Sequence, residues 1–181
     1  MIGRPCTKQL IAESLKELMK KRSFEKITVK MIVDNCHVTR QTFYKYFQDK
    51  YDLLGWVFST NIDRILESSS GEQSWCKVLE EMLRYMKEEQ TFYVNAVSYR
   101  GQNNLKHVIL EYTRTAYARE LRKRLNTEDL SQEFLASIEF NSYGAAGFIY
   151  NWIGENMSTE PKLLAQFIAD NMPEKMKQYF N

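Results

Sequence analysis

Apolar residues recur at steps of three and four along almost the whole chain, and this spacing restricts the possible folds more than any other feature. The first such stripe consists of Leu10, Ile11, Leu15, Leu18 and Met19. Spacing of this kind places apolar side chains on one face of a helix. Only seven glycines and three prolines interrupt the 181 residues, and we find no alternation of apolar and polar residues typical of strands. The pattern predicts an all-α protein.

Candidate capping residues and breaks in the apolar pattern divide the chain into about nine helices. Thr7, Thr28, Thr39 and Asp49 are suited to begin the first four helices, and Pro161 is suited to the first turn of the last. We expect the helices near residues 7–22, 29–35, 39–47, 50–67, 73–88, 90–99, 105–125, 131–157 and 161–179, with breaks at 68–71 and 100–104. The second and third helices are short and separated by three residues, which is a helix-turn-helix layout.

Basic residues are concentrated at the start of the chain. Residues 1–50 contain eleven Lys and Arg against five Asp and Glu, a net charge of +6. Residues 51–181 contain fourteen against eighteen, a net charge of −4. The basic first segment indicates a polyanionic partner.

Several classes of protein are disfavoured by missing patterns. No GxSxG, phosphate-binding loop, HExxH or GxGxxG pattern occurs, and His107 is a lone helical histidine, so we expect no enzyme and no catalytic residue. Three widely spaced cysteines and two histidines give no zinc pattern, and we expect no metal or cofactor. The N-terminal sequence lacks a signal-peptide core, and the apolar run 143–154 is too short to span a bilayer. We therefore expect a cytoplasmic protein with reduced thiols and no membrane contact.

The segment from Thr28 to Leu54 resembles the DNA-binding head of TetR-family transcriptional regulators. The features that carry the resemblance are TVKMIV (28–33), a turn that ends at Val38, TRQTFYKYF (39–47) and DKYDLL (49–54). Two positions depart from the family pattern: His37 stands where glycine is usual, and Gln41 stands where a small residue is common. Histidine tolerates positive φ better than most side chains, so the turn can be retained. The base preference of relatives cannot be transferred through Gln41.

This resemblance implies a helix-turn-helix DNA-binding domain over residues 1–50 and an effector-response and dimerisation domain over residues 51–181. The run FYVNAVSYRGQNNL (92–105) and the later GAAGFIYNWI are similar to a TetR subgroup that includes activators of dihydroxyacetone kinase operons. For that subgroup the resemblance implies control by a protein co-activator in place of a metabolite.

The first turns of the third helix carry side chains that can read base edges. Arg40 can donate two hydrogen bonds to guanine, Gln41 can pair with adenine, and Thr42 can contact a thymine methyl. Helix starts and neighbouring polar residues are expected to hold the DNA backbone. The expected phosphate contacts are Thr28, Thr39, Tyr44, Lys45, Tyr46 and Lys50, with Lys30 suited to a base or a phosphate. Phe43 and Phe47 are expected to be buried on the opposite arc. The alternatives are a solvated face for Arg40 and Gln41 and partial burial for Tyr46.

Aromatic residues are frequent in the second part of the chain and can line an apolar effector pocket. The candidates are Tyr85, Tyr93, Tyr99, Tyr112 and Phe140, with ordinary core packing as the alternative. Within YGAAGFIYNWIG, small and aromatic residues together with the last helix look like the two-fold four-helix dimer interface of TetR-like proteins. The candidates for that interface are Gly144, Gly147, Phe148 and Trp152.

Together these features predict a homodimeric transcriptional regulator that binds a pseudo-palindromic operator in double-stranded DNA and responds to a ligand at its C-terminal domain. Repression is the default expectation, and activation through a protein co-activator follows if the subgroup resemblance holds. A helical interaction module that does not bind DNA is the alternative of a different class. The sequence specifies neither the operator nor the effector.

Overall fold

The protein is entirely helical over the residues that the structure, a computed structural model, describes: 6–68, 74–99, 101 and 104–180. These residues form ten α-helices and one 3-10 helix. The elements are α1 (Thr7–Met19), η1 (Phe24–Lys26), α2 (Val29–Asn35), α3 (Arg40–Tyr44), α4 (Lys50–Ser68), α5 (Trp75–Glu88), α6 (Gln90–Ser98), α7 (Leu105–Leu125), α8 (Gln132–Gly154), α9 (Pro161–Asp170) and α10 (Glu174–Lys177). The predicted fold class is confirmed. No helix of the described residues is long and apolar enough to cross a membrane.

The predicted caps account for where the helices near the N-terminus begin. Thr28 Oγ1 accepts a hydrogen bond from Met31 N at 3.3 Å, and Thr39 Oγ1 accepts one from Thr42 N at 3.1 Å. Asp49 Oδ1 accepts from two backbone N–H groups at the start of α4, each at 2.8 Å. These bonds satisfy N–H groups that have no partner within the helix. The first helix differs, because its N-cap is Cys6 and Thr7 is already helical.

Four predicted helix ends need correction. Helix α3 ends at Tyr44, three residues before the expected end at residue 47. Helix α1 ends at Met19, and α8 ends at Gly154, where a turn with positive φ at Asn156 and Met157 reverses the chain. The single helix expected over 161–179 is two helices, because Pro173 has no N–H to continue α9. Part of the expected break at 68–71, the expected start at residue 73 and most of the break at 100–104 lie outside the described residues.

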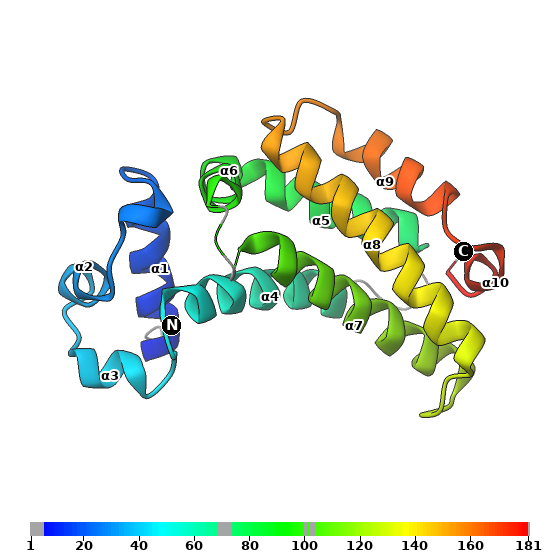
Figure 1. Ribbon diagram of the computed structural model, residues 1–181, viewed down its shortest axis with the longest axis horizontal. Coiled ribbons are helices and arrows are strands. Elements are labelled where there is room, and N and C mark those ends of the chain that lie inside the picture. The colour runs from blue at the N-terminus through cyan, green and yellow to red at the C-terminus, as the bar shows by residue number, and fades with distance from the viewer. Residues whose placement is uncertain (1–5, 69–73, 100, 102–103, 181) are drawn as a thin grey trace.

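The helices form a small head and a larger body (Figure 1). Helices α1, α2 and α3 make the head, and α4 runs from the head into the body. In the body, α7 lies along α4 and packs on α8, while α5 packs against α9. The head is therefore joined to the body through the peptide chain by α4 alone.

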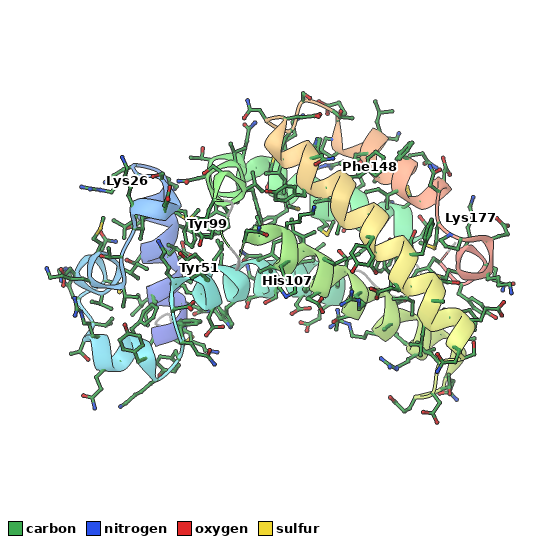
Figure 2. All side chains as sticks on the ribbon, viewed as in Figure 1. Lys26, Tyr51, Tyr99, His107, Phe148 and Lys177 are labelled. Atoms are coloured by element: carbon green, nitrogen blue, oxygen red, sulfur yellow. The ribbon has the colours of Figure 1, made fainter. Side chains whose placement is uncertain are left out.

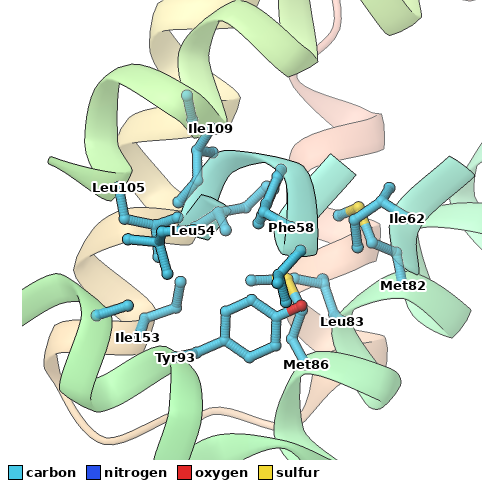
Figure 3. Close-up of a cluster of buried hydrophobic side chains, with 14 of the residues drawn as sticks. Leu54, Phe58, Ile62, Met82, Leu83, Met86, Tyr93, Leu105, Ile109 and Ile153 are labelled. Carbon is cyan, nitrogen blue, oxygen red and sulfur yellow. The ribbon is translucent and has the colours of Figure 1, made fainter. Parts of the chain in front are cut away.

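Apolar burial joins the helices of the body (Figure 3). The ring of Tyr93 from α6 is fully buried and points into a cluster that includes Phe58 of α4 and Leu83 of α5. The rings of Phe58 and Tyr93 meet edge to face, with 6.3 Å between their centroids. Burial on this scale is the main force that holds helices of ordinary propensity in place.

Candidate nucleic-acid interface

Helices α2 and α3 and the turn between them form a compact unit in the head. The turn closes through a hydrogen bond from Val38 N to Val33 O at 3.0 Å. His37 has a φ of 55°, in the left-handed region. This is the conformation that glycine adopts most easily after a helix, and the prediction that histidine occupies it here is confirmed.

The aromatic residues of α3 and the turn after it divide between the core and the solvent. Phe43 and Phe47 are buried and their ring centroids lie 5.7 Å apart. Tyr44 and Tyr46 are 57% and 42% exposed, so the predicted division by helical phase is confirmed. The buried rings fix α3 on the head and leave its other face open to solvent.

The first turn of α3 presents polar side chains on this open face. Arg40 and Gln41 are exposed, and Thr42 is partly exposed. The hydroxyls of Thr39 and Thr42 lie 2.9 Å apart, which holds both at the start of the helix. A helix with a solvent-exposed, polar first turn can enter the major groove with these side chains toward the bases.

Other predicted contact residues surround this turn. Lys45 is exposed, and Thr28 lies exposed at the start of α2. Lys30 Nζ lies 3.0 Å from Asp34 Oδ2, and both side chains are exposed. An exposed ion pair of this kind contributes about 0–1 kcal/mol, so the pair does not prevent Lys30 from turning to a DNA phosphate.

Lys50 is placed differently from the prediction of a phosphate contact. Its ammonium group donates hydrogen bonds to the carbonyl oxygens of Phe24, Glu25 and Ile27 at 2.9, 2.9 and 2.8 Å. The Nζ atom also lies 4.8 Å from the centroid of the Phe24 ring. An ammonium has three donors, and all three are used within the protein. Burial lowers the pKa of Lys50 from its ordinary value, and we assign this residue to the junction of η1 with α4.

The five aromatic residues proposed for an effector pocket do not gather around one cavity. Tyr93 is part of the core, where burial raises its pKa well above the ordinary value. Tyr99 packs on Tyr51 at the junction with the head, and Tyr85 is half-buried beside α1.

Phe140 is 76% exposed and cannot line a pocket within its own chain. Tyr112 lines a cavity, and its hydroxyl donates to Asp63 Oδ1 at 2.8 Å.

This cavity lies between α4, α5, α7 and α8 and has a volume of about 30 Å³. Its walls are mostly apolar and include Trp75 and Tyr117, two residues that the sequence analysis did not select. Trp75 Nε1 and the Tyr117 hydroxyl are buried without a hydrogen-bond partner. A volume of this size suits one or two water molecules rather than a metabolite. No helical spacing distinguishes Trp75 from other core residues. Tyr117 is one of the frequent aromatic residues of this part of the chain, but nothing in the sequence places its ring at a cavity.

An apolar face on α8 and α9 is open to solvent. Gly144 and Gly147 have no neighbouring atom within 4 Å of the position that a Cβ would take. Phe148 is exposed and lies 4.8 Å from Phe167 of α9 between ring centroids, and Figure 2 shows Phe148 at this outer side of the body. Trp152, predicted for the same face, is 3% exposed and donates Nε1–H to Thr159 O at 2.8 Å. It belongs to the protomer core, because it is buried on the inner side of α8.

A helix-turn-helix head with an exposed polar helix, joined by α4 to an all-helical body, defines a class of regulatory protein. Residues 11–55 match the family model for bacterial regulatory proteins of the tetR family. Residues 73–174 match a model described as a transcriptional regulator C-terminal region of the TetR type. The chain belongs to the TetR family.

Named relatives agree with this assignment. The HTH-type dhaKLM operon transcriptional activator DhaS of Lactococcus lactis subsp. lactis (strain IL1403) is 36% identical over 87 residues, and the match spans 48% of this chain and 46% of that relative. The chain therefore matches about half the length of this curated relative.

Solved structures show the same fold over nearly the whole chain. The dihydroxyacetone kinase operon activator DhaS has a TM-score of 0.67 at 23% identity, covering 97% of this chain and 99% of that one. RolR without ligand has a TM-score of 0.62 at 15% identity, covering 94% and 95%.

Proposed function

We propose that this protein is a sequence-specific DNA-binding transcriptional regulator that acts as a homodimer. The observation that carries the proposal is the exposed first turn of α3, fixed from below by the buried rings of Phe43 and Phe47. Under this proposal residues 1–50 contact DNA, and residues 51–181 provide dimerisation and control.

The contacts follow from the chemistry of the exposed side chains. Arg40 donates two hydrogen bonds to a guanine, Gln41 pairs with an adenine, and Thr42 contacts a thymine methyl. Residues around this turn hold the phosphates and set the register of the head on the duplex. They are Thr28, Lys30, Thr39, Tyr44, Lys45 and Tyr46.

The dimer forms through the outer face of α8 and α9. Gly144 and Gly147 let a partner helix approach closely, and exposed aromatic and aliphatic side chains surround them. These are Phe140, Tyr143, Phe148, Leu163 and Phe167. A cluster of large apolar side chains in solvent marks an interaction site, and a symmetric dimer uses the same face of both subunits. Two heads related in this way bind the two halves of a pseudo-palindrome.

Activation is the second candidate for the direction of regulation, beside the repression expected by default. A relative that matches about half of this chain is named as an operon activator. That name favours activation. A reporter gene under the control of the bound promoter separates the two, since expression rises with an activator and falls with a repressor.

The test of DNA binding uses the DNA upstream of the gene for this protein. We expect a protected, roughly symmetric site and an affinity that falls steeply with salt. Arg40→Ala should relax the choice of base at its position by about 1–3 kcal/mol, and Lys45→Ala should weaken all sequences alike. If neither change alters binding, the contact assignment is wrong. An affinity that is absent or independent of salt would favour the helical interaction module.

A further inference from the structure

Helix α10 lies at the far end of the body from the head (Figure 1). It has four residues and follows Pro173. The segment 174–180, which contains α10, places the side chain of Phe180 inside the body, where it is only 2% exposed. A single turn of helix has no stability of its own in water. Contacts with the body therefore hold this segment in place.

The Phe180 ring occupies a site formed by three side chains of the body. Trp75 of α5 and Tyr117 of α7 meet it edge to face, with 5.2 and 5.5 Å between ring centroids. The guanidinium carbon of Arg124 in α7 lies 5.6 Å from the centroid of the Phe180 ring, and a cation is attracted to the face of an aromatic ring. Two aromatic rings and a cation are contacts that a free aromatic molecule can use in the same way.

The backbone of Phe180 makes a second kind of contact. Its carbonyl oxygen accepts a hydrogen bond from Trp75 N at 2.9 Å, and Trp75 is the first residue of α5. The N-cap of this helix, Ser74, makes no side-chain capping bond. The unpaired N–H groups and the dipole at a helix start stabilise negative charge. A carboxylate in the place of the Phe180 carbonyl is therefore held more strongly than the carbonyl itself.

Polar groups beside the Phe180 ring have no hydrogen-bond partner in the chain. They are Trp75 Nε1, the Tyr117 hydroxyl and Asn141 Nδ2, and all three are buried. Burial raises the pKa of Tyr117, and Trp75 and Asn141 lie close enough to its hydroxyl to oppose that rise, so the three groups form one cluster. Unpaired buried groups destabilise the arrangement that buries them. The closed arrangement is thus less stable than its ring contacts suggest, which favours exchange of Phe180 for another occupant.

The remainder of the segment is attached to the body by one surface ion pair and one apolar side chain. Lys175 pairs with Glu133 of α8, and both side chains are more than half exposed. An exposed ion pair contributes little to stability. Met176 is fully buried. Release of the segment therefore requires chiefly that two apolar side chains, those of Met176 and Phe180, leave the body.

We propose that the site occupied by Phe180 binds small arylpropanoates, and that the segment 174–180 is a displaceable stopper that competes with them. From its ring to its carbonyl carbon, Phe180 has the carbon skeleton of 3-phenylpropanoate. Such a ligand places its ring against Trp75, Tyr117 and Arg124 and its carboxylate at the start of α5. Trp75 and Tyr117 also line the cavity of about 30 Å³, but Phe180 does not, so the two sites are separate. Binding at this site does not depend on the proposed function.

The first experiment titrates the full chain with 3-phenylpropanoate and with 3-phenylpropanamide in a calorimeter. The amide has the same ring and length but no charge. We expect the unmodified protein to bind the carboxylate roughly fivefold more tightly than the amide, because the helix start favours an anion.

Three variants test the parts of the site. Phe180→Ala should bind 3-phenylpropanoate roughly tenfold more tightly than the unmodified protein, because the stopper no longer competes for the site. Ile109→Ala, which removes a buried side chain from the same helix as Tyr117 but away from the ring cluster, is the matched control and should leave the affinity unchanged. Arg124→Gln should weaken binding of the carboxylate by roughly threefold and leave binding of the amide unchanged. The effect is small because Glu120 pairs with Arg124 at 2.6 Å and balances part of its charge.

The second experiment follows the stopper in the unmodified protein by trypsin cleavage after Lys175, identified by mass spectrometry. Proteolysis requires local opening of the chain, so saturating 3-phenylpropanoate should accelerate this cleavage by roughly fivefold. Cleavage after Lys162, an exposed residue of α9, should not change. This measurement needs no variant, so it decides the proposal even if Phe180→Ala does not fold.

Two results would overturn the proposal. If Phe180→Ala binds 3-phenylpropanoate and the unmodified protein does not bind it up to the solubility limit, Phe180 is only an anchor for the end of the body. If the unmodified protein binds the ligand without faster cleavage after Lys175, the ligand does not displace the stopper.

Discussion

Replacing Lys50 with methionine tests whether this residue stabilises the junction of η1 with α4 or contacts a DNA phosphate. Methionine keeps most of the apolar stem and removes the charge. In the structure the ammonium makes three hydrogen bonds to carbonyl oxygens at 2.8–2.9 Å. A hydrogen bond to a charged group contributes about 1.5 kcal/mol, which would give roughly 4–5 kcal/mol for three. The side chain is only partly buried, so water can hydrogen-bond to some of the carbonyl oxygens that lose the ammonium. The protein also no longer bears the cost of desolvating the ammonium. We therefore expect Lys50→Met to lower the free energy of unfolding by about 2 kcal/mol.

Urea denaturation of the full chain measures this loss, and the salt dependence of DNA binding distinguishes the roles. A residue that contacts phosphate contributes about one unit to the slope of log affinity against log salt. We expect Lys50→Met to leave that slope unchanged. Lys45→Met, on the exposed surface of the head, should instead reduce the slope and leave stability within about 0.5 kcal/mol. If Lys50→Met is as stable as the unmodified protein and reduces the salt slope, Lys50 contacts DNA and our assignment to the junction fails.

Three further predictions concern the turn, the dimer face and the head–body junction. His37→Gly should raise the free energy of unfolding by about 1 kcal/mol, because a φ of 55° strains a residue with a side chain but not glycine. Asn126→Gly, at a φ of 51°, should raise the free energy of unfolding by less, because asparagine tolerates this region. Equal increases in the two variants would contradict this explanation. Phe140→Asp should shift the protein from dimer to monomer in light scattering without lowering its helix content, since this side chain is 76% exposed in the protomer; a dimer that persists unchanged would place the interface elsewhere. The hydrogen bond with Tyr99, together with burial, raises the pKa of Tyr51 to about 12, so the unfolded chain loses this proton first and stability should fall between pH 10 and 12. In urea denaturation, the free energy of unfolding of Tyr51→Phe should fall less over that pH range than that of the unmodified protein. An identical fall in both proteins would show that the raised pKa of Tyr51 does not cause the loss of stability.

The amino-acid sequence by itself determined where α2 and α3 begin and which side chains of α3 and the turn after it are buried. Caps such as Thr28 and Thr39 act on groups three residues away, and the burial of Phe43 and Phe47 follows from a spacing of four. Caps and buried faces depend on residues within one or two turns of the same helix, so they can be predicted from residues that are close in the sequence. The positive φ of His37 was expected from the family resemblance, because glycine is usual at that position.

Tertiary structure alone decided the roles that depend on contacts between distant residues. Lys50 meets carbonyl groups 23 to 26 positions earlier, and Asn95 meets the head across 71 to 76 positions. Neither residue has a local spacing that distinguishes it from an exposed polar residue. The same holds for Trp152, which the resemblance to a TetR-like dimer interface assigned to a surface, and for Phe140, which the frequency of aromatic residues assigned to a pocket. Only the packing of α8 on its neighbours decides which of its faces is buried, because every face of a helix rich in apolar residues satisfies the same sequence pattern.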